Sequence, residues 1–238
     1  QAKSLAEYAL KIGATAIAHG STGAGNDQVR FDGIFNIVCP QMEIITPIRD
    51  LKLSREAEIE YLTNKGFSGD YTKSVYSINQ GLWGTSVGGK ETLTSHSNLP
   101  EEAYPSQLKK QNPEKLTLEF EKGHLIKIND QKFSHPSEAI VKLNEIASEF
   151  AIGRDTHVGD TIIGIKGRVG FEAAGAILTL KAHHLLEKHV LSKYQLMIKS
   201  QMADWYGTWL HEALFLDPVM RDIEKLMGEN LVKIFRAN

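Results

Sequence analysis

The first fifty residues alternate between apolar positions at helical spacing and short apolar runs. Residues 4–12 carry Leu, Tyr, Ala and Ile at helical spacing, and Gly13 is typical of the end of a helix. The apolar runs 14–18 and 42–48 each predict a buried strand, and residues 26–38 predict a helix between them. This order of elements, with a glycine-rich loop before the second helix, is typical of a doubly wound α/β sheet. Two strands are too few for a stable parallel sheet, so we expect this segment to be its second half.

From residue 54 onward the pattern is that of an α+β domain. Ser54 is typical of a helix N-cap, Gly66 is typical of the end of that helix, and Lys122 with Gly123 predicts a hairpin turn between apolar runs. Further helices are predicted at 136–150, 182–200, 203–214 and 218–228, and further strands at 161–165, 176–180 and 231–235. Residues 49–53 are typical of a linker, and residues 67–113 show no clear period. The sequence therefore predicts an α/β fold, with half of a doubly wound parallel sheet at residues 1–50 and an α+β domain at residues 54–238.

Composition narrows the classes of partner. The chain has 238 residues, of which 42% are apolar and 24% charged, as expected of a folded globular protein. The 27 basic and 29 acidic residues give a net charge of −2, which disfavours nucleic acid and anionic membranes as partners. The single cysteine, Cys39, cannot form an internal disulfide or a multi-cysteine zinc site, so we expect a reducing compartment, the cytoplasm. The first residues, without Met or a signal-peptide hydrophobic region, predict a processed chain or a fragment.

The strongest chemical signal is the segment 19–31, HGSTGAGNDQVRF. Its glycines allow backbone N–H groups to converge, and the helix that follows adds a partial positive charge, which together favour a phosphate or a carboxylate. Asn26, Asp27 and Arg30 are spaced to share one helix face, where Arg30 could bind the carboxylate of an amino acid and Asp27 its ammonium group. Alternatively, the loop merely turns the chain and Asp27 with Arg30 forms a surface ion pair. Spacing alone does not separate these two interpretations.

Three segments resemble the argininosuccinate synthase family. Residues 19–31 fit its second signature, G-x-T-x-K-G-N-D-x-x-R-F, except that Ala24 stands where many members have Lys. Residues 76–86, YSINQGLWGTS, are similar to the family's Y-S-I-D-E-N-L-W-G-x-S, and residues 164–172, GIKGRVGFE, are similar to I-G-x-K-S-R-G-x-Y-E. The resemblance covers essentially the whole chain, but the family's S-G-G-L-D-T-S pyrophosphate loop and its C-terminal oligomerisation segment have no counterpart. We therefore expect an internal piece of such a synthase.

This resemblance implies an AMP-forming carbon–nitrogen ligase of arginine biosynthesis. Its substrates are citrulline, aspartate and ATP with Mg²⁺, its intermediate is citrullyl-AMP, and its products are argininosuccinate, AMP and pyrophosphate. It implies a nucleotide-binding domain of the adenine nucleotide alpha hydrolase type at residues 1–50 and a C-terminally truncated synthetase and multimerisation domain at residues 54–238. It further implies a homo-oligomer, a tetramer in the family, with no prosthetic group and no resident metal. The piece alone is expected to be inactive.

The resemblance also implies which residues bind each substrate. ATP is implied at His19, Gly20, Ser21, Thr22, Gly23 and Gly25; aspartate at Thr22, Asn26 and Asp27; citrulline at Asn26, Arg30, Ser77, Ser86, Asp160 and Phe171. Two positions depart from the family: its Glu is Gly159 here, with Asp160 adjacent as a shorter substitute, and its Tyr is Phe171, which lacks the hydroxyl. No covalent protein nucleophile is required, because such chemistry proceeds by positioning and charge stabilisation.

Other patterns are weaker. Residues 84–90 nearly match a Walker A loop, but Glu91 stands where Ser or Thr should ligate magnesium, so a glycine turn is the better interpretation. The histidine-rich segment 183–189 predicts an amphipathic helix face rather than a metal site, and Trp205, Tyr206 and Trp209 predict core or subunit contacts. Two rival functions stay open: a non-catalytic amino-acid or nucleotide-binding module, and a different AMP-forming ligase of the same superfamily. An S-G-G-L-D-T-S loop upstream of Gln1 would favour the enzyme.

Overall fold

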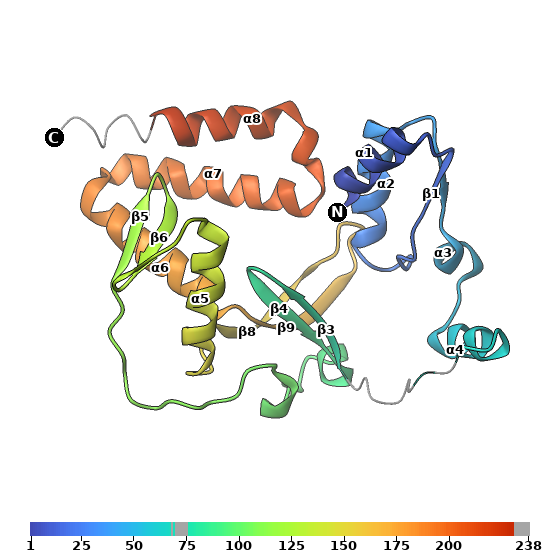
Figure 1. The fold of residues 1–238 in the computed structure, drawn as a ribbon, viewed down its shortest axis with the longest axis horizontal. Helices are drawn as coiled ribbons and strands as arrows, with labels where there is room; N and C mark the ends of the chain where they lie inside the picture. Colours follow the sequence, from blue (N-terminus) through green and yellow to red (C-terminus); the bar gives the residue numbers. More distant parts are fainter. Residues whose placement is uncertain (68, 70–75, 231–238) are drawn as a thin grey trace. The chain divides into compact units, whose positions relative to one another are not determined.

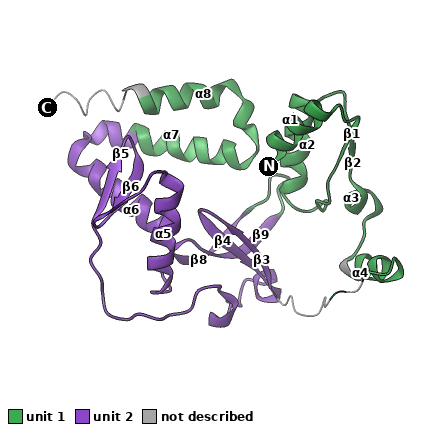
Figure 2. Ribbon diagram, viewed as in Figure 1, with its two compact units in different colours: residues 1–73, 160–165, 198–234 green, residues 74–159, 166–197, 235–238 purple. Residues whose placement is uncertain are grey.

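A computed structural model describes residues 1–67, 69 and 76–230 of the chain. The chain forms two compact units, each assembled from separate stretches of sequence (Figure 2). Unit 1 comprises residues 1–73, 160–165 and 198–234, and unit 2 comprises residues 74–159, 166–197 and 235–238. Within the described residues no helix has both the length and the apolar character needed to span a bilayer.

Unit 1 begins with alternating helices and short strands (Figure 1). Its elements are α1 (Ala2–Ile12), β1 (Ala16–Ala18), α2 (Asp27–Val38), β2 (Glu43–Ile45), α3 (Pro47–Leu51) and α4 (Arg55–Asn64). Strands β1 and β2 are parallel, with Ile17 opposite Ile44. The apolar faces of α1 and α2 meet strand β1 in a core that contains Ala6, Ala9, Ile17, Phe35 and Cys39. The predicted helices at 4–12 and 26–38 and the strand within 14–18 are therefore confirmed, as is a parallel pair of strands.

The predictions for residues 42–53 were partly wrong. Strand β2 ends at Ile45, and residues 47–51, which we assigned to the strand and the linker, form helix α3. Pro47 occupies the first turn of α3, where its fixed φ angle suits a helix and its missing N–H costs nothing. The helix ends at Lys52, which has a left-handed φ of 50°. In contrast, α4 begins as predicted, because the Ser54 hydroxyl accepts a hydrogen bond from the amide of Ala57.

Unit 2 contains a four-stranded sheet in the order β3-β4-β9-β8. Its strands are β3 (Ser77–Gly81), β4 (Gly84–Gly88), β8 (Arg154–Asp160) and β9 (Lys166–Glu172). The sequence analysis predicted none of these four strands, because their Ser, Asn, Gly and charged residues supply no clear apolar alternation. The predicted strand at 161–165 was wrong: these residues form the turn between β8 and β9, closed by a hydrogen bond of 2.8 Å from the Thr161 amide to the Ile165 carbonyl. Gly164, with a left-handed φ of 83°, makes this turn possible.

A second layer of unit 2 packs helices on a small sheet. The sheet consists of β5 (Leu118–Glu121), β6 (His124–Ile128) and β7 (Gln131–Lys132), and α5 (Pro136–Ser148) and α6 (Ala174–Val190) pack against one another. Leu125 and Ile128 of β6 meet Ala139, Ile140 and Leu143 of α5 in the core. The predicted hairpin and the helix from Pro136 are confirmed. Short 3₁₀ turns, η1 (Lys90–Leu93) and η2 (Glu101–Ala103), interrupt the segment that showed no period.

Several boundaries near the C-terminus differ from the predictions. Residues 176–180, predicted as a strand, belong to α6, where the Thr179 hydroxyl donates to the Gly175 carbonyl one turn earlier. The next helix, α7 (Lys193–His211), begins at 193 rather than 203, because Ser192 and Gln195 exchange backbone–side-chain hydrogen bonds that cap it.

After η3 (Leu214–Leu216), helix α8 (Pro218–Lys225) starts at the predicted Asp217 cap. The α-helical geometry stops at Lys225 and gives way to a π turn at Leu226–Asn230, so Gly228 is not the stop. The predicted strand at 231–235 lies outside the described residues.

Candidate functional site

The glycine loop leaves the carboxyl end of β1 and enters the N-terminus of α2. The His19 amide donates to the Ile45 carbonyl at 3.0 Å, which carries the parallel pairing one residue beyond β1. In open α/β sheets this edge is where ligands bind, and the α2 N-terminus adds its partial positive charge there. Among the described residues, the backbone amides of Thr22, Gly23 and Ala24 make no hydrogen bond within the chain. These donors are therefore available to an anion.

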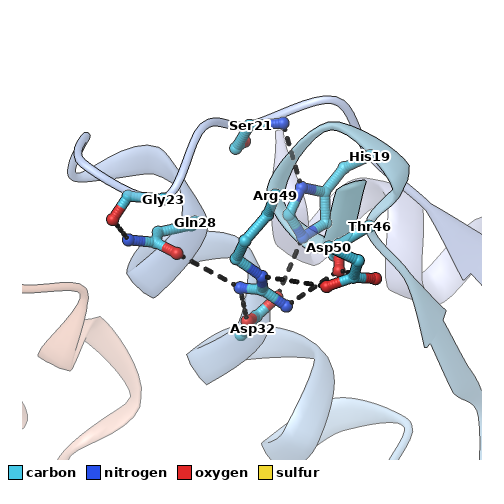
Figure 3. Close-up of polar contacts among 8 residues, drawn as sticks. All are labelled: His19, Ser21, Gly23, Gln28, Asp32, Thr46, Arg49 and Asp50. Carbon is cyan, nitrogen blue, oxygen red and sulfur yellow. Dashed lines mark hydrogen bonds and ion pairs between the residues drawn. The ribbon is translucent and has the colours of Figure 1, made fainter. Parts of the chain in front are cut away.

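A polar network lies beneath this loop (Figure 3). Its centre is Arg49 of α3, whose Nη1 lies 2.5 Å from Asp32 Oδ2 and 3.3 Å from Gln28 Oε1. The opposite side of the same guanidinium is held by α3 itself and its cap: Nη2 donates to the Thr46 hydroxyl at 3.1 Å, and Nε lies 3.8 Å from Asp50 Oδ1. The sequence analysis placed these residues in predicted elements or in the signature segment but proposed none of them as a site residue. The available signal was a charged residue directly after the predicted second strand, at the sheet edge where ligands bind.

His19 links the network to the loop. Its side chain is only 5% exposed and stacks on Phe31, with ring centroids 5.4 Å apart. The Ser21 amide donates to Nδ1 at 3.3 Å, and Nε2 lies 2.9 Å from Asp32 Oδ1. Because the Ser21 amide is a donor, Nδ1 must be the acceptor, and Nε2 must carry the hydrogen that it donates in the hydrogen bond to Asp32. This assigns neutral His19 to the Nε2–H tautomer.

The environment of Asp32 keeps it ionised. Burial acts to raise the pKa of Asp32, but the hydrogen bonds from Arg49 and His19, together with their charges, outweigh it and lower this pKa below the ordinary value of 3.8. Asp32 is thus a fixed carboxylate between a guanidinium and an imidazole N–H. A fixed negative charge on one side of the imidazole ring stabilises the tautomer that accepts from the loop.

Asn26, Asp27 and Arg30 come together at the mouth of α2, as predicted. Arg30 Nη1 lies 3.3 Å from Asp27 Oδ1, so the ion pair of the alternative interpretation is present. Two further segments form hydrogen bonds with these residues, and the sequence analysis did not connect either segment with the loop. Arg30 Nε donates to the His211 carbonyl at 2.9 Å, and the Ile162 amide, in the β8–β9 turn, donates to Asn26 Oδ1 at 2.8 Å.

A hollow of about 390 Å³ opens beside this corner. Asp27 and Arg30 contribute charged groups to it, Lys3 of α1 adds a cation, and Phe31 and Phe215 form part of its apolar wall. Both charges of a small zwitterion thus have a counter-charge within one hollow of unit 1. The arrangement can bind an amino acid, although Arg30 already shares its guanidinium with His211 through a second contact of 3.0 Å to Nδ1.

Three of the citrulline candidates share one face of the unit 2 sheet. Ser86 lies opposite Asn79 on β3 and opposite Phe171 on β9, and Ser77 lies two residues before Asn79. Side chains of directly paired residues, and of residues two apart, point to the same side of a sheet. Asp160 is exposed at the end of β8, two residues before Ile162. Because Asn26 and Arg30 belong to unit 1, joint use of all six citrulline candidates stays a prediction.

The discounted motifs have structural roles. Residues 84–88 of the Walker-like segment form strand β4, which pairs with β3 and β9 along its two edges, so they form no phosphate loop. His183 Nδ1 lies 3.0 Å from the buried Glu187, and within the described part of the chain no group of three or more His, Cys, Asp or Glu could hold a metal. Trp205 packs on Trp209, with ring centroids 5.3 Å apart.

Comparisons with known proteins agree with the motifs. The family described as "Arginosuccinate synthase N-terminal HUP domain" matches residues 1–68, and "Arginosuccinate synthase C-terminal domain" matches residues 76–234. Proteins named argininosuccinate synthase from Methanocaldococcus jannaschii, Metallosphaera sedula and Pyrococcus furiosus are 38%, 36% and 35% identical to the chain. Each alignment covers 98% of this chain but only 62%, 59% and 59% of the respective relative. The chain thus spans about three-fifths of the length of these relatives.

Proposed function

The chain belongs to the argininosuccinate synthase family, and from this premise we propose that it carries part of the site of an AMP-forming carbon–nitrogen ligase. The ligase joins citrulline and aspartate at the expense of ATP and forms argininosuccinate, AMP and pyrophosphate. The observation that supports this most directly is the joint placement of a loop with open amides and the corner of Asn26, Asp27 and Arg30 at one helix mouth.

The proposed roles follow the chemistry of each group. ATP, as its magnesium salt, would lie on the loop from His19 to Gly25, where amide donors and the α2 N-terminus favour phosphate. Aspartate would be held at Thr22, Asn26 and Asp27, and citrulline at Asn26, Arg30, Ser77 and Ser86. Asp160 is proposed to replace the family's Glu, while Phe171 supplies an apolar wall instead of a hydroxyl.

The reaction has two displacement steps. The ureido oxygen of citrulline attacks the α-phosphorus of ATP, and the bond to the pyrophosphate leaving group breaks. The aspartate amine, once it has lost a proton, then attacks the ureido carbon, and AMP leaves with the former ureido oxygen. Both steps need charged groups held in place rather than a protein nucleophile, which fits a site built of amides, one guanidinium and carboxylates.

We propose in addition that residues 1–50 are part of a doubly wound nucleotide-binding domain and that residues 54–238 belong to a synthetase and multimerisation domain. A homo-oligomer, a tetramer in the family, and a cytoplasmic location complete the proposal. The parallel pair β1–β2 supports the first of these statements, because parallel strands joined through a helix are the repeating unit of doubly wound sheets.

The test uses the protein expressed from its complete reading frame. We expect pyrophosphate and AMP release that requires both citrulline and aspartate, and transfer of ¹⁸O from the citrulline ureido group to the phosphate of AMP. Release without transfer of the label would contradict an adenylated citrulline. Binding of ATP and the amino acids without any product would instead support the non-catalytic binding module.

A further inference from the structure

We propose that Arg49 is a positioning residue that sets the conformation of the glycine loop, residues 20–25, through two hydrogen-bonded arms. Both arms start at one nitrogen of its guanidinium and end on the backbone of the loop (Figure 3). The inference rests on the proposed nucleotide-binding role of this loop and adds to it the residue that holds the loop in shape.

The first arm runs through two side chains to a backbone donor. Arg49 Nη1 lies 2.5 Å from Asp32 Oδ2, Asp32 Oδ1 accepts a hydrogen bond from His19 Nε2 at 2.9 Å, and His19 Nδ1 accepts from the Ser21 amide. Each link fixes the next, since the Asp32 carboxylate selects the tautomer of His19 that leaves Nδ1 free to accept. The Ser21 amide is thereby turned toward the interior of unit 1.

The second arm runs through one side chain to a backbone acceptor. Arg49 Nη1 donates to Gln28 Oε1 at 3.3 Å, and Gln28 Nε2 donates to the Gly23 carbonyl. Gln28 is only 8% exposed, so its amide has few other orientations. Because the guanidinium donates to Oε1, Nε2 must be the group that faces the loop. The Gly23 carbonyl is thereby also turned inward.

The guanidinium itself is anchored on the opposite side. Nη2 donates to the hydroxyl of Thr46, which is 1% exposed and in turn donates to Asp50 Oδ2 at 2.7 Å. These contacts hold the plane of the guanidinium, so the two hydrogens of Nη1 point in fixed directions, one for each arm. A lysine could offer a charge to Asp32 but not this planar fork.

Fixing the loop at residues 21 and 23 also determines which backbone amides of the loop stay open to a ligand. One amide and one carbonyl are committed to the interior, while the amides of Thr22, Gly23 and Ala24 stay open within the described residues. A loop held in this form before ATP arrives loses less conformational entropy on binding. In this arrangement Arg49 acts on the loop through Asp32, His19 and Gln28, so its role is positioning.

The experiment compares four forms of the protein expressed from its complete reading frame: wild type, Arg49→Met, Arg49→Lys and a control, Lys11→Met. Lys11 is exposed near the end of α1 and makes no contact with the network, so the control removes one positive charge from unit 1. Nuclear magnetic resonance measures the tautomer of His19 and the exchange rate of the Ser21 amide, and calorimetric titration measures ATP affinity. Circular dichroism establishes that each form is folded.

We expect Arg49→Met to raise the exchange rate of the Ser21 amide about tenfold, the effect of losing one hydrogen bond, and to reduce the Nε2–H population of His19. ATP affinity should fall by about the same factor. Arg49→Lys should keep the first arm and lose the second: the Ser21 amide stays protected while the Gln28 side-chain amide signals move. Lys11→Met should match the wild type in every measurement.

The proposal is overturned if a folded Arg49→Met keeps the wild-type Ser21 exchange rate and the wild-type His19 tautomer. If Arg49→Met does not fold, the Arg49→Lys variant provides the test. Unchanged Gln28 signals together with unchanged ATP affinity in Arg49→Lys would overturn the two-armed arrangement. Failure of the wild-type chain to bind ATP would count against the proposed function of the loop alone, because the exchange and tautomer measurements contain no nucleotide.

Discussion

Arg30 is the side chain whose contacts bear most directly on the choice between a binding corner and a simple surface ion pair. It is 36% exposed, it pairs with Asp27, and it also contacts the carbonyl and ring of His211. A guanidinium with five donors can serve these partners and still offer an edge to a carboxylate. An ion pair with Asp27, which is 71% exposed, contributes little to the stability of the fold. A gain in stability therefore does not explain the pairing of Asp27 with Arg30.

We predict that Arg30→Ala, in the protein of the complete reading frame, weakens citrulline binding by about 1.5–3 kcal/mol, or roughly ten- to a hundredfold. The reason is the loss of a charged hydrogen bond to the substrate carboxylate. The Michaelis constant for citrulline, measured by pyrophosphate release, checks this. An unchanged constant would remove Arg30 from the site.

The matched variant is Asp27→Asn, which keeps the size of the side chain and removes only its charge. If Asp27 binds an ammonium group, this variant should impair the use of aspartate more than the use of citrulline. Equal impairment of both would show that Asp27 only supports the loop.

Helices and strands of this chain were predictable where apolar spacing defines them. The helix at 4–12 and the hairpin around Gly123 have apolar residues in register with a buried face, and the structure places them as expected. Strands β3 and β4 carry Ser, Asn and Gly on a sheet with few apolar residues, so no periodicity could reveal them. The run at 176–180 is apolar enough for a strand, but its neighbours extend it into a helix of 17 residues.

The part of the candidate site that depends on local sequence spacing was also predictable. Motif spacing brought Asn26, Asp27 and Arg30 together because they share one turn of helix. His211 and Ile162 reach the same corner from residues more than 130 positions away, and Arg49 reaches the loop from the helix after the next strand. Such contacts depend on tertiary packing, which local patterns do not encode.

The start of helix α6 gives a test of close packing. A Cβ on Gly175 would lie 2.6 Å from Asn144 Oδ1 and 2.9 Å from the backbone nitrogen of Asn144, and that Oδ1 accepts a hydrogen bond from the Gly175 amide at 2.7 Å. We predict that Gly175→Ala lowers stability by about 1–3 kcal/mol, because overpacking displaces Asn144. Gly207 in α7 is the control: nothing lies within 4 Å of the place that a methyl group would take there, so Gly207→Ala should raise stability by about 0.5–1 kcal/mol. Urea unfolding measures both, and a loss of equal size at the two positions would contradict the packing argument.

Strands β8 and β9 are joined to the segment at 101–106 by one guanidinium, that of Arg154, whose side chain is 13% exposed. Arg154 Nε donates to Glu172 Oε2 at 2.8 Å, Nη1 lies 2.5 Å from Glu101 Oε1, and Nη2 donates to the Ser106 carbonyl. The guanidinium also lies 4.5 Å from the centre of the Tyr104 ring. This one side chain therefore satisfies the carboxylate of Glu172, which is only 7% exposed.

We predict that Arg154→Met destabilises the protein by about 3–5 kcal/mol, because it leaves the Glu172 charge buried without a partner. Adding Glu172→Gln should recover part of this loss, since the uncompensated charge is then removed. Arg221→Met serves as the control, because Arg221 is 45% exposed and its pair with Glu224 should contribute less than about 1 kcal/mol. If the double variant is no more stable than Arg154→Met in urea unfolding, the cost does not come from the buried charge.

The stability of the whole chain should depend on pH through the network beneath the glycine loop. Since the pKa of Asp32 is lowered in the folded protein, its stabilising contribution is present above the ordinary value of 3.8 and is lost as the pH falls from there through the lowered pKa. Asp32→Asn removes this titration and should therefore be less stable than the wild type near neutral pH, with the difference shrinking below about pH 4. Because the chain has two units, the signal must report unit 1 alone: in a Trp83→Phe background the remaining tryptophans, Trp205 and Trp209, both lie in unit 1. Urea unfolding followed by the fluorescence of these two residues, from pH 7 to pH 3, checks this. Lys11→Met is the charge control and should keep the wild-type dependence of stability on pH. A difference in stability between wild type and Asp32→Asn that stays constant over this range would show that Asp32 has no linked titration.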